Sequence, residues 1–325
     1  MKKFLFLLFF PLCIFAVACS TEDLNVDAYN ISQDEGDEDS DRSEDSVFIN
    51  VLIIGNSLSR DAFSYVPFIM ENSCVGLKIN VSILYIGGVA LSTHWDYLSK
   101  GKNKFLLDSY SLANGKWVTT SNVDGSVVIQ QKWNFVMLQE GSVKGRTYAE
   151  SLINVDNFKK AIKDVNPEAK IAYMINPPHA DGDKSIEPYS SDDIWEMFAR
   201  TAGELLERND VDYIIPCGTA IQNARHTYLD ALGDFGHLSY DGVHLQEGIP
   251  CLIDAYTVSQ SLINLFDLGT SINNNTLQVN QEWVKEKNIP GQHGKAIIGS
   301  SEDYELCKRC ALAAVENPFC ITTIQ

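Results

Sequence analysis

The chain has 325 residues and a formal net charge of −18 at pH 7, with 43 acidic residues against 25 lysines and arginines. So acidic a chain has no basic surface to neutralise phosphates, which excludes nucleic acid as its main partner. The length allows one large domain or two small ones, and a core of that size does not need structural disulfides.

The first residues have the pattern of an export signal. Lys2 and Lys3 precede an uncharged apolar run over residues 4–18. As a helix this run would span about 22 Å at roughly 1.5 Å per residue, short of the roughly 30 Å hydrocarbon core of a bilayer. The pattern therefore predicts a signal peptide over residues 1–18 rather than a membrane span.

A cysteine follows this run directly. Ala16, Val17 and Ala18 precede Cys19, and small residues before a cysteine resemble a bacterial lipobox. The resemblance implies that the Cys19 thiol is acylated and anchors the chain to the outer membrane. The alternative is ordinary cleavage near Ala18, which leaves Cys19 as a spare thiol.

An acidic segment comes next. Eleven acidic residues and one basic residue lie between Glu22 and Asp45. Such a segment repels itself and cannot bury enough surface to fold, so residues 19–46 are predicted to be a disordered tether. Acidic residues behind a lipidated cysteine also resemble the export signal of surface lipoproteins, which implies a surface-exposed place on the cell envelope. The alternative is a solubilising tail that carries no address.

From residue 47 onward, strand-like and helix-like segments alternate. Five short apolar runs have the length of buried strands, namely residues 48–54, 78–86, 135–138, 169–175 and 211–215. Helical spacing is found over residues 60–74, 149–165, 191–209 and 246–268. Because such alternation implies crossover connections, we predict a three-layer α/β/α sandwich with a five-stranded parallel sheet.

One region interrupts this alternation. Residues 100–131 contain Asn114-Gly115 and Asp124-Gly125, which are turn signals between short β-favouring runs. We therefore predict an inserted hairpin or lid near the exit of the second strand, within a domain that spans residues 47–270.

The C-terminal residues 271–325 are predicted to be an accessory segment that packs on the same domain and ends in a helix over 302–315. Within it, Cys307 and Cys310 have the spacing of half a zinc site, but no second pair of cysteines or histidines accompanies them. We therefore expect no metal and no cofactor, and either two thiols on an apolar face or a local disulfide with Cys320.

The first strand is followed by a candidate nucleophile. Ligands of an open parallel sheet bind beyond the carboxyl ends of the strands. Ser57 lies at such an end, in Gly55-Asn56-Ser57-Leu58-Ser59. A serine here can attack a substrate or merely cap a helix. Because position 59 is Ser rather than Gly, the segment is not the G-x-S-x-G elbow of α/β-hydrolases.

A candidate base lies near the other end, in Asp241-Gly242-Val243-His244. An aspartate and a histidine three residues apart share one side of a helical turn, so the carboxylate can hold Nδ1–H and leave Nε2 free. The pair predicts the base and its orienting acid in a Ser–His–Asp triad. The alternative is an ordinary Asp-Gly surface turn.

Candidate donors to an oxyanion follow the second and third strands. Gly87-Gly88 ends the second strand, where the missing side chains allow a backbone N–H to approach a substrate oxygen. Gln139 ends the third strand, and its side-chain amide is a second candidate donor. A tight turn and a bridging hydrogen bond are the respective alternatives.

In this order, the four features resemble those of the SGNH hydrolase superfamily, over about residues 51–268. That superfamily has a G-D-S-like block after the first strand, a glycine after the second, an asparagine after the third and a D-x-x-H block near the end. Residues 216–225 also resemble a segment of its branch in bacterial lipoproteins. The resemblance implies a flavodoxin-like fold and ester hydrolysis through an acyl-enzyme.

The resemblance assigns roles residue by residue. It makes Ser57, His244 and Asp241 catalytic, and places the oxyanion against Ser57, Gly88 and Gln139, with Gly87 as the alternate donor. Two positions depart from the pattern: Asn56 replaces the usual Asp, and Gln139 replaces the usual Asn. The extra methylene of Gln139 moves its amide by more than about 1 Å, a distance that matters to oxyanion binding.

Four residues near these strand ends are candidates for substrate contacts: Asn56, His94, Glu140 and His179. We expect an exported monomer that removes acetyl or other short acyl groups from a glycan or another small acylated substrate. A lipase or thioesterase of the same fold is one alternative. A catalytically silent glycan-binding lipoprotein of the cell surface is the other.

Overall fold

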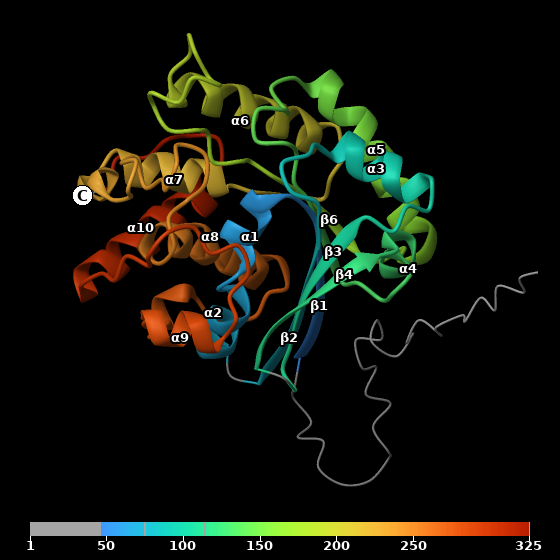
Figure 1. Cartoon of the computed structure of the whole chain (residues 1–325), viewed down its shortest axis with the longest axis horizontal. Helices are drawn as coiled ribbons and strands as arrows, with labels where there is room; N and C mark the ends of the chain where they lie inside the picture. The colour runs from blue at the N-terminus through green and yellow to red at the C-terminus, as the bar shows by residue number, and fades with distance from the viewer. Residues whose placement is uncertain (1–46, 75, 114, 325) are drawn as a thin grey trace, which may run out of the picture. The chain divides into compact units, whose positions relative to one another are not determined.

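The computed structural model describes residues 47–74, 76–113 and 115–324 (Figure 1). Contacts divide the chain into residues 1–40 and 41–325, and the described residues all belong to the second part. The predicted signal peptide, the Cys19 anchor and the acidic tether lie outside the described residues. Within the described ranges, no helix is both long and apolar enough to cross a membrane.

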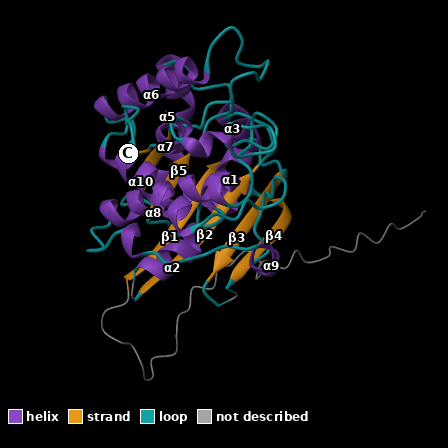
Figure 2. Ribbon diagram, turned by 90° about the vertical axis from the view of Figure 1, so that its left-hand side faces the viewer, coloured by secondary structure: helices purple, strands orange, loops and turns teal. Residues whose placement is uncertain are grey.

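A seven-stranded mixed sheet forms the centre of the described part, with the order β4-β3-β2-β1-β5-β6-β7 (Figure 2). Its strands are β1 (Val47–Gly55), β2 (Leu77–Tyr85), β3 (Phe105–Ser111), β4 (Lys116–Val123), β5 (Phe135–Leu138), β6 (Lys170–Met174) and β7 (Tyr213–Ile215). The strands β2, β1, β5, β6 and β7 run parallel, at the five predicted places.

The prediction of a sheet with only five strands is wrong. The segment predicted as an inserted hairpin or lid is a hairpin, because β4 pairs antiparallel with β3. It continues the sheet and is not a lid, because β3 pairs antiparallel with β2. Asp124-Gly125, by contrast, is not a hairpin turn. Asp124 is the N-cap of helix α4 (Gly125–Ile129), and its side chain accepts a hydrogen bond from Ser126 N–H.

The helices cover both faces of the sheet (Figure 1). Besides α4 they are α1 (Ser57–Phe63), α2 (Val66–Ser73), α3 (Leu91–Ser99), α5 (Tyr148–Val165), α6 (Ser191–Glu207), α7 (Cys217–Arg225), α8 (Ile249–Leu265), α9 (Gln281–Glu286) and α10 (Ser301–Glu316), with short 3₁₀ turns at Tyr228–Ala231 and Ile272–Asn274. Alternation along β1 explains the two layers: Val51 and Ile53 join the core under α1, α2 and α8, whereas Leu52 and Ile54 are buried on the opposite face.

The helix predicted over residues 60–74 is two helices. The first, α1, ends at Phe63, and α2 begins at Val66 with Pro67 in its first turn. A proline has no N–H to give to a preceding turn, so it starts a new helix more readily than it continues one. The short first helix leaves Ser57 at its N-terminus and turns the chain before it reaches the second strand.

The C-terminal residues share the core of the domain. Helix α10 packs against α8 and α7, and Cys307 and Cys310 lie fully buried on its inner face. The six cysteines of the described residues are free thiols, and Cys320 is the exposed one. The two cysteines of the C-x-x-C pair are thus small apolar residues of the core.

Candidate active site

The nucleophile candidate is positioned by the turn between β1 and α1. Asn56 is the N-cap of α1, and its side-chain oxygen accepts a hydrogen bond of 3.1 Å from Leu58 N–H. Gly55 is required in this turn, because a Cβ there would lie 2.5 Å from Gln139 Oε1 and closer still to Ser59 Oγ. Ser57 therefore begins α1 at the carboxyl end of the central parallel strand.

The structure brings the three predicted triad residues together. Ser57 Oγ lies 2.8 Å from His244 Nε2, and His244 Nδ1 lies 2.8 Å from Asp241 Oδ2. Asp241 Oδ1 also accepts hydrogen bonds from the N–H groups of Val243 and His244, at 2.9 and 2.8 Å. Each distance is within hydrogen-bond range, which orients the imidazole with Nε2 toward the hydroxyl.

The Asp241 carboxylate is suited to an imidazolium partner. Partial burial raises the pKa of Asp241, but the hydrogen bonds from His244 and Val243 outweigh burial and hold the pKa below its ordinary value. The segment is an irregular loop rather than the predicted helical turn, because Gly242 has a φ of +92°. Asp241 and His244, three residues apart, reach each other because Gly242 between them adopts a left-handed backbone conformation.

Gln139 does not serve as the predicted donor to an oxyanion. Its side chain is fully buried, and Oε1 accepts hydrogen bonds from Asn56 N–H at 2.8 Å and from Ser59 Oγ at 2.9 Å. Its Nε2 donates to the carbonyl of Glu140 and, at 3.3 Å, to Asn176 Oδ1. Both ends of the amide are thus occupied, and the residue braces the turn that carries Ser57.

The glycines after β2 lie at the surface beside this turn. Gly87 and Gly88 are exposed, and Gly88 adopts a φ of +65° with open space where a Cβ would be. The next carbonyl, that of Val89, accepts a hydrogen bond of 3.0 Å from Asn56 Nδ2. The glycine loop and the nucleophile turn are therefore tied to each other through Asn56.

Residues 50–291 match the family DUF4886, described as a domain of unknown function. The chain belongs to the DUF4886 family. No curated protein matches it.

Three solved structures resemble this DUF4886 protein. A DUF4886 family protein from Bacteroides uniformis ATCC 8492 is 19% identical, with 86% of this chain and 98% of that chain covered and a TM-score of 0.72. A proposed GDSL-like lipase from Parabacteroides merdae ATCC 43184 is 13% identical, with 68% and 96% covered and a TM-score of 0.40. A proposed platelet activating factor from Streptococcus pneumonia is 15% identical, with 67% and 84% covered and a TM-score of 0.37. The first of these shows a shared α/β fold over almost all of its length.

Two of the residues expected to contact substrate have structural roles in the DUF4886 domain. Asn56 is only 1% exposed and uses its amide to cap α1 and to bond Val89. Glu140 is equally buried, and its carboxylate accepts hydrogen bonds from Leu91 N–H, Gly141 N–H and Asn154 Nδ2. Both side chains hold loops around the site and do not face a substrate, so those two predictions are wrong.

The prediction that His94 contacts substrate is also wrong. It lies on the inner side of α3 with no exposed surface, and its ring packs against Phe105 at a centroid distance of 5.7 Å. Neither ring nitrogen has a hydrogen-bond partner among the described residues. Burial lowers the pKa of His94 to about 3, so it is a neutral core residue rather than a substrate contact.

His179 lies beside the loop of Asp241 and His244 but is buried. The N–H of the next residue, Ala180, donates to the Gly242 carbonyl at 2.8 Å, which joins the two loops. His179 Nδ1 lies 2.6 Å from Ser185 Oγ. Burial lowers the pKa of His179 more than its neighbour Asp183 raises it. The backbone after His179, rather than its ring, therefore ties this segment to the loop of Asp241.

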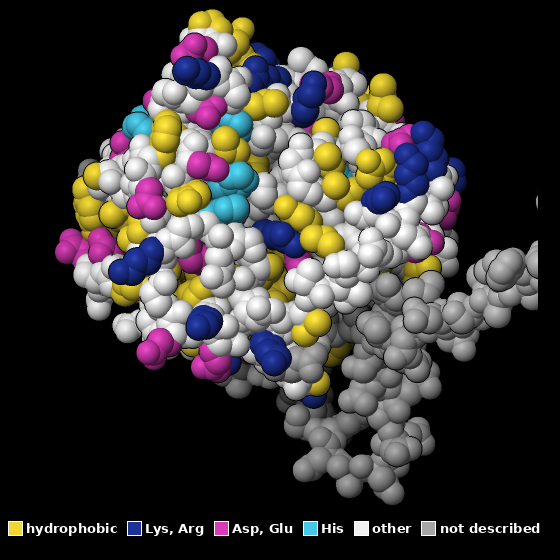
Figure 3. All heavy atoms as spheres, in the orientation of Figure 1, with side chains coloured by type: hydrophobic (Ala, Val, Ile, Leu, Met, Phe, Trp, Pro, Cys, Tyr) yellow, Lys and Arg dark blue, Asp and Glu magenta, His cyan; other side chains and the backbone are white. Residues whose placement is uncertain are grey.

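A histidine that the sequence did not indicate completes the site. His293 stacks on His244 with ring centroids 4.2 Å apart and planes 23° from parallel. Figure 3 shows histidine side chains gathered near the middle of one face. His293 lies in an irregular segment between α9 and α10, where no periodicity or motif marks it. Only the return of the C-terminal segment to the loop of Asp241 and His244 brings it there.

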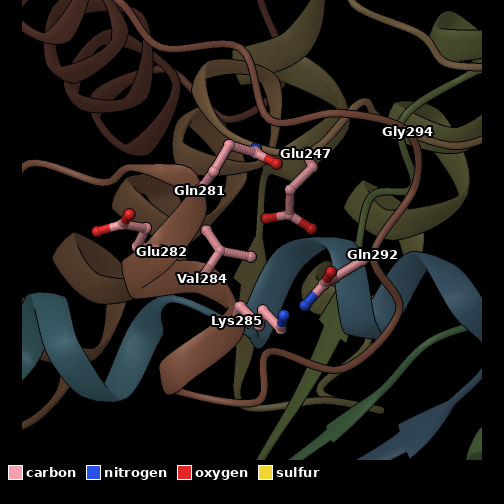
Figure 4. Close-up of a pocket in the computed structure, with 7 residues that line it drawn as sticks. All are labelled: Glu247, Gln281, Glu282, Val284, Lys285, Gln292 and Gly294. Atoms are coloured by element: carbon pink, nitrogen blue, oxygen red, sulfur yellow. The ribbon is translucent and has the colours of Figure 1, made fainter.

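A separate hollow of about 410 Å³ lies under the same C-terminal segment (Figure 4). It is lined by Glu247, Gln281, Glu282, Val284, Lys285, Gln292 and Gly294. Glu247 is buried at its floor, where burial raises the pKa of the carboxyl group and Tyr65 donates a hydrogen bond to it. None of the three triad residues lines this hollow, so it is distinct from the site at Ser57.

Proposed function

We propose that this DUF4886 protein is a serine ester hydrolase. The observation that carries the proposal is the continuous chain of two 2.8 Å contacts from Ser57 Oγ through the His244 imidazole to Asp241. That arrangement is the nucleophile, base and orienting acid of a triad. It lies at the carboxyl end of β1, where ligands of parallel sheets bind.

The proposed reaction has two halves. Ser57 Oγ attacks the ester carbonyl while His244 Nε2 takes its proton, and Asp241 stabilises the resulting imidazolium. His244 then gives the proton to the departing alcohol, which leaves an acyl group on Ser57. A water molecule, deprotonated by His244, attacks this acyl-enzyme and releases the acid.

The proposed oxyanion donors are backbone groups. Ser57 N–H is the first of α1, and no acceptor within the described ranges takes it. Gly88 N–H belongs to the exposed loop that Asn56 ties to the same turn. Gln139 is not part of this hole, because its amide is already bonded at both ends. Its contribution is to fix the turn that aims Ser57 N–H.

The proposed substrate is an acetyl or other short acyl ester on a carbohydrate, met outside the cell by a monomer anchored to the outer membrane through Cys19. The resemblance to SGNH hydrolases and the signal-like N-terminus support this choice. A screen of acetylated sugars, read as acetate release and compared with long-chain acyl esters, tests it. Preference for long acyl chains would favour a lipase or thioesterase instead.

The triad itself is tested with p-nitrophenyl acetate and an alkyl fluorophosphonate. The wild-type protein is expected to hydrolyse the ester and to be phosphonylated at Ser57, as read by peptide mass spectrometry. Ser57→Ala and His244→Ala are expected to lose roughly ten-thousand-fold in rate and to remain unlabelled. Wild-type rates in Ser57→Ala would show that Ser57 is not the nucleophile. A wild type that neither hydrolyses the ester nor is labelled would leave the silent glycan-binding lipoprotein as the better explanation.

A further inference from the structure

The catalytic imidazole is covered on one face by a second imidazole. The rings of His293 and His244 stack at 4.2 Å between centroids, and Tyr240 stacks on His293 at 6.3 Å. Stacked aromatic rings at these separations attract each other and limit the tilting of the inner ring. The face of His244 that would otherwise meet water is therefore occupied by another side chain.

The backbone holds His293 in this place. Its carbonyl accepts a hydrogen bond of 3.0 Å from Glu247 N–H, three residues beyond His244. Ile297 N–H in turn donates to the Glu247 carbonyl at 2.9 Å, and Ile249 N–H donates to the Ile297 carbonyl at 3.1 Å. The C-terminal segment thus runs beside the residues that follow His244. These three backbone hydrogen bonds fix its position against them.

A buried carboxylate connects both histidine loops to the helix of the nucleophile. Asp61 lies one turn after Ser57 in α1 and is 2% exposed. Its Oδ2 accepts a hydrogen bond of 3.2 Å from Leu245 N–H, the residue after His244. Its Oδ1 lies 3.4 Å from His293 Nε2, without a hydrogen bond between the two atoms. One carboxylate thus bonds the loop of His244 and lies beside the stacking ring, from the element that carries Ser57.

The neutral state of His293 suits a neighbouring His244 that becomes positively charged during the reaction. Burial lowers the pKa of His293 to about 4, and His244 and Arg60 act in the same direction, whereas Asp241 opposes them. The other ionisable groups that face the ring are Asp61 and Tyr240. His293 is consequently neutral near pH 7, and its ring adds no second positive charge when His244 takes the proton of Ser57.

We propose that His293, held by the hydrogen bond from Glu247 N–H to its carbonyl, is the positioning residue that keeps the His244 imidazole aligned between Asp241 and Ser57. This inference rests on the proposed esterase function. His293 touches neither substrate nor the reacting oxygen, and acts through the ring it covers. A rotation of His244 that moves Nε2 by about 1 Å is enough to cost on the order of a hundredfold in rate.

Three variants test the role. His293→Ala removes the stacking ring, His293→Phe keeps a ring without its nitrogens, and His226→Ala is the matched control. His226 is a half-exposed histidine, 3.4 Å from Asp192 and outside the site. The measurements are kcat and KM for p-nitrophenyl acetate from pH 5 to 9, the rate of fluorophosphonate labelling of Ser57, and the urea midpoint of unfolding.

We expect His293→Ala to lower kcat and the labelling rate by between about tenfold and a hundredfold with KM within about twofold, because alignment acts on the reacting groups rather than on binding. The acid limb of its kcat profile should move to higher pH, since water then solvates the exposed face of the imidazolium. His293→Phe should restore most of kcat, and His226→Ala should match the wild type.

A second readout does not need turnover. The Nδ1–H of His244, in its hydrogen bond to Asp241, should give a downfield proton resonance in the wild type and in His293→Phe. The resonance should broaden through exchange with water in His293→Ala, even if that variant is less stable.

Wild-type labelling and kcat in His293→Ala would overturn the inference and leave the triad intact. Equal losses in His293→Ala and His293→Phe that follow their urea midpoints would also overturn it, because they would indicate a purely structural residue. A wild type that is never labelled at Ser57 would instead overturn the proposed function and the inference together.

Discussion

Gln139 Oε1 accepts a 2.8 Å hydrogen bond from the N–H of Asn56, the residue directly before Ser57. The same oxygen accepts from Ser59 Oγ at 2.9 Å, so one buried amide directly after β5 spans the turn that carries Ser57. The site is therefore braced across two neighbouring parallel strands. Gln139, at the position where the resemblance to SGNH hydrolases predicts an asparagine, thus has a structural role in the turn of Ser57.

Replacement of Gln139 by Ala should destabilise the protein and disturb the turn. The substitution leaves the buried Asn56 N–H and Ser59 hydroxyl without their acceptor, which costs about 1–3 kcal/mol for each unsatisfied group. We expect a lower urea midpoint together with a fall in kcat. A loss of a hundredfold or more in kcat with an unchanged midpoint would instead identify Gln139 as an oxyanion donor.

Replacement of Gly55 by Ala tests how closely the turn is packed. The added Cβ would lie 2.5 Å from Gln139 Oε1, and overpacking of a well-filled site typically costs about 1–3 kcal/mol. Gly203→Ala in α6 is the matched control, since its nearest neighbour would be Phe319 at 3.8 Å. That control should be neutral or gain up to about 1 kcal/mol from helix propensity. Equal midpoints for the two variants would contradict the packing argument.

Asp241→Asn should cost roughly a thousandfold to ten-thousandfold in kcat. An amide nitrogen facing His244 Nδ1 favours the wrong tautomer, so Nε2 can no longer accept the proton of Ser57. The control is Asp230→Asn, which alters a second Asp–His pair, in which Asp230 Oδ1 lies 2.9 Å from His237 Nδ1. Ester hydrolysis should be normal in Asp230→Asn, and a comparable loss there would refute the assignment of Asp241.

The sequence predicted the places of the five parallel strands and the pairing of Asp241 with His244, because apolar runs and short motifs report the local chain. Prediction from the sequence failed where contacts between segments far apart in the chain determine the structure. The hairpin signals at Asn114-Gly115 could not show that β3 would pair with β2 rather than form a lid. Glu140, a polar residue after a strand, was expected to face a substrate. Its carboxylate instead accepts hydrogen bonds from neighbouring backbone N–H groups.

The same limit explains the second imidazole at the site. His293 lies in a segment with no regular pattern, and its contact with His244 depends on hydrogen bonds between Glu247 and the returning chain. Nothing in its neighbourhood in the sequence distinguishes it from the exposed His226. By contrast, Asp241 and His244 are three residues apart, so their hydrogen bond is a local property that spacing can reveal.

The shape of the Asp61 side chain should matter more to kcat than its charge does. Burial raises the pKa of Asp61 well above its ordinary value, and the carboxylates of Asp254, Glu247 and Asp241 add to this, although the Leu245 N–H opposes it. Asp61→Asn keeps an oxygen for Leu245 N–H and should retain kcat within about threefold. Asp61→Ala removes the contacts to both histidine loops and should lose about tenfold in kcat, which corresponds to about 1.4 kcal/mol of activation free energy. Equal activity in these two variants would show that Asp61 does not hold the loops.

The buried His94 should make the stability of the protein depend on pH. Burial lowers its pKa to about 3 in the folded chain, whereas an unfolded histidine has a pKa of about 6.5. The unfolded state therefore binds more protons below about pH 6.5, and the folded state loses about 1.4 kcal/mol per pH unit between about pH 6.5 and pH 3.

His94→Leu removes this proton site from the packing contact with Phe105. From pH 7 to pH 5, the free energy of unfolding of the wild type should fall by about 2 kcal/mol more than that of the variant. Urea titrations at both pH values measure the difference. Parallel losses in the two proteins would mean that His94 binds its proton in the folded state as readily as in the unfolded one.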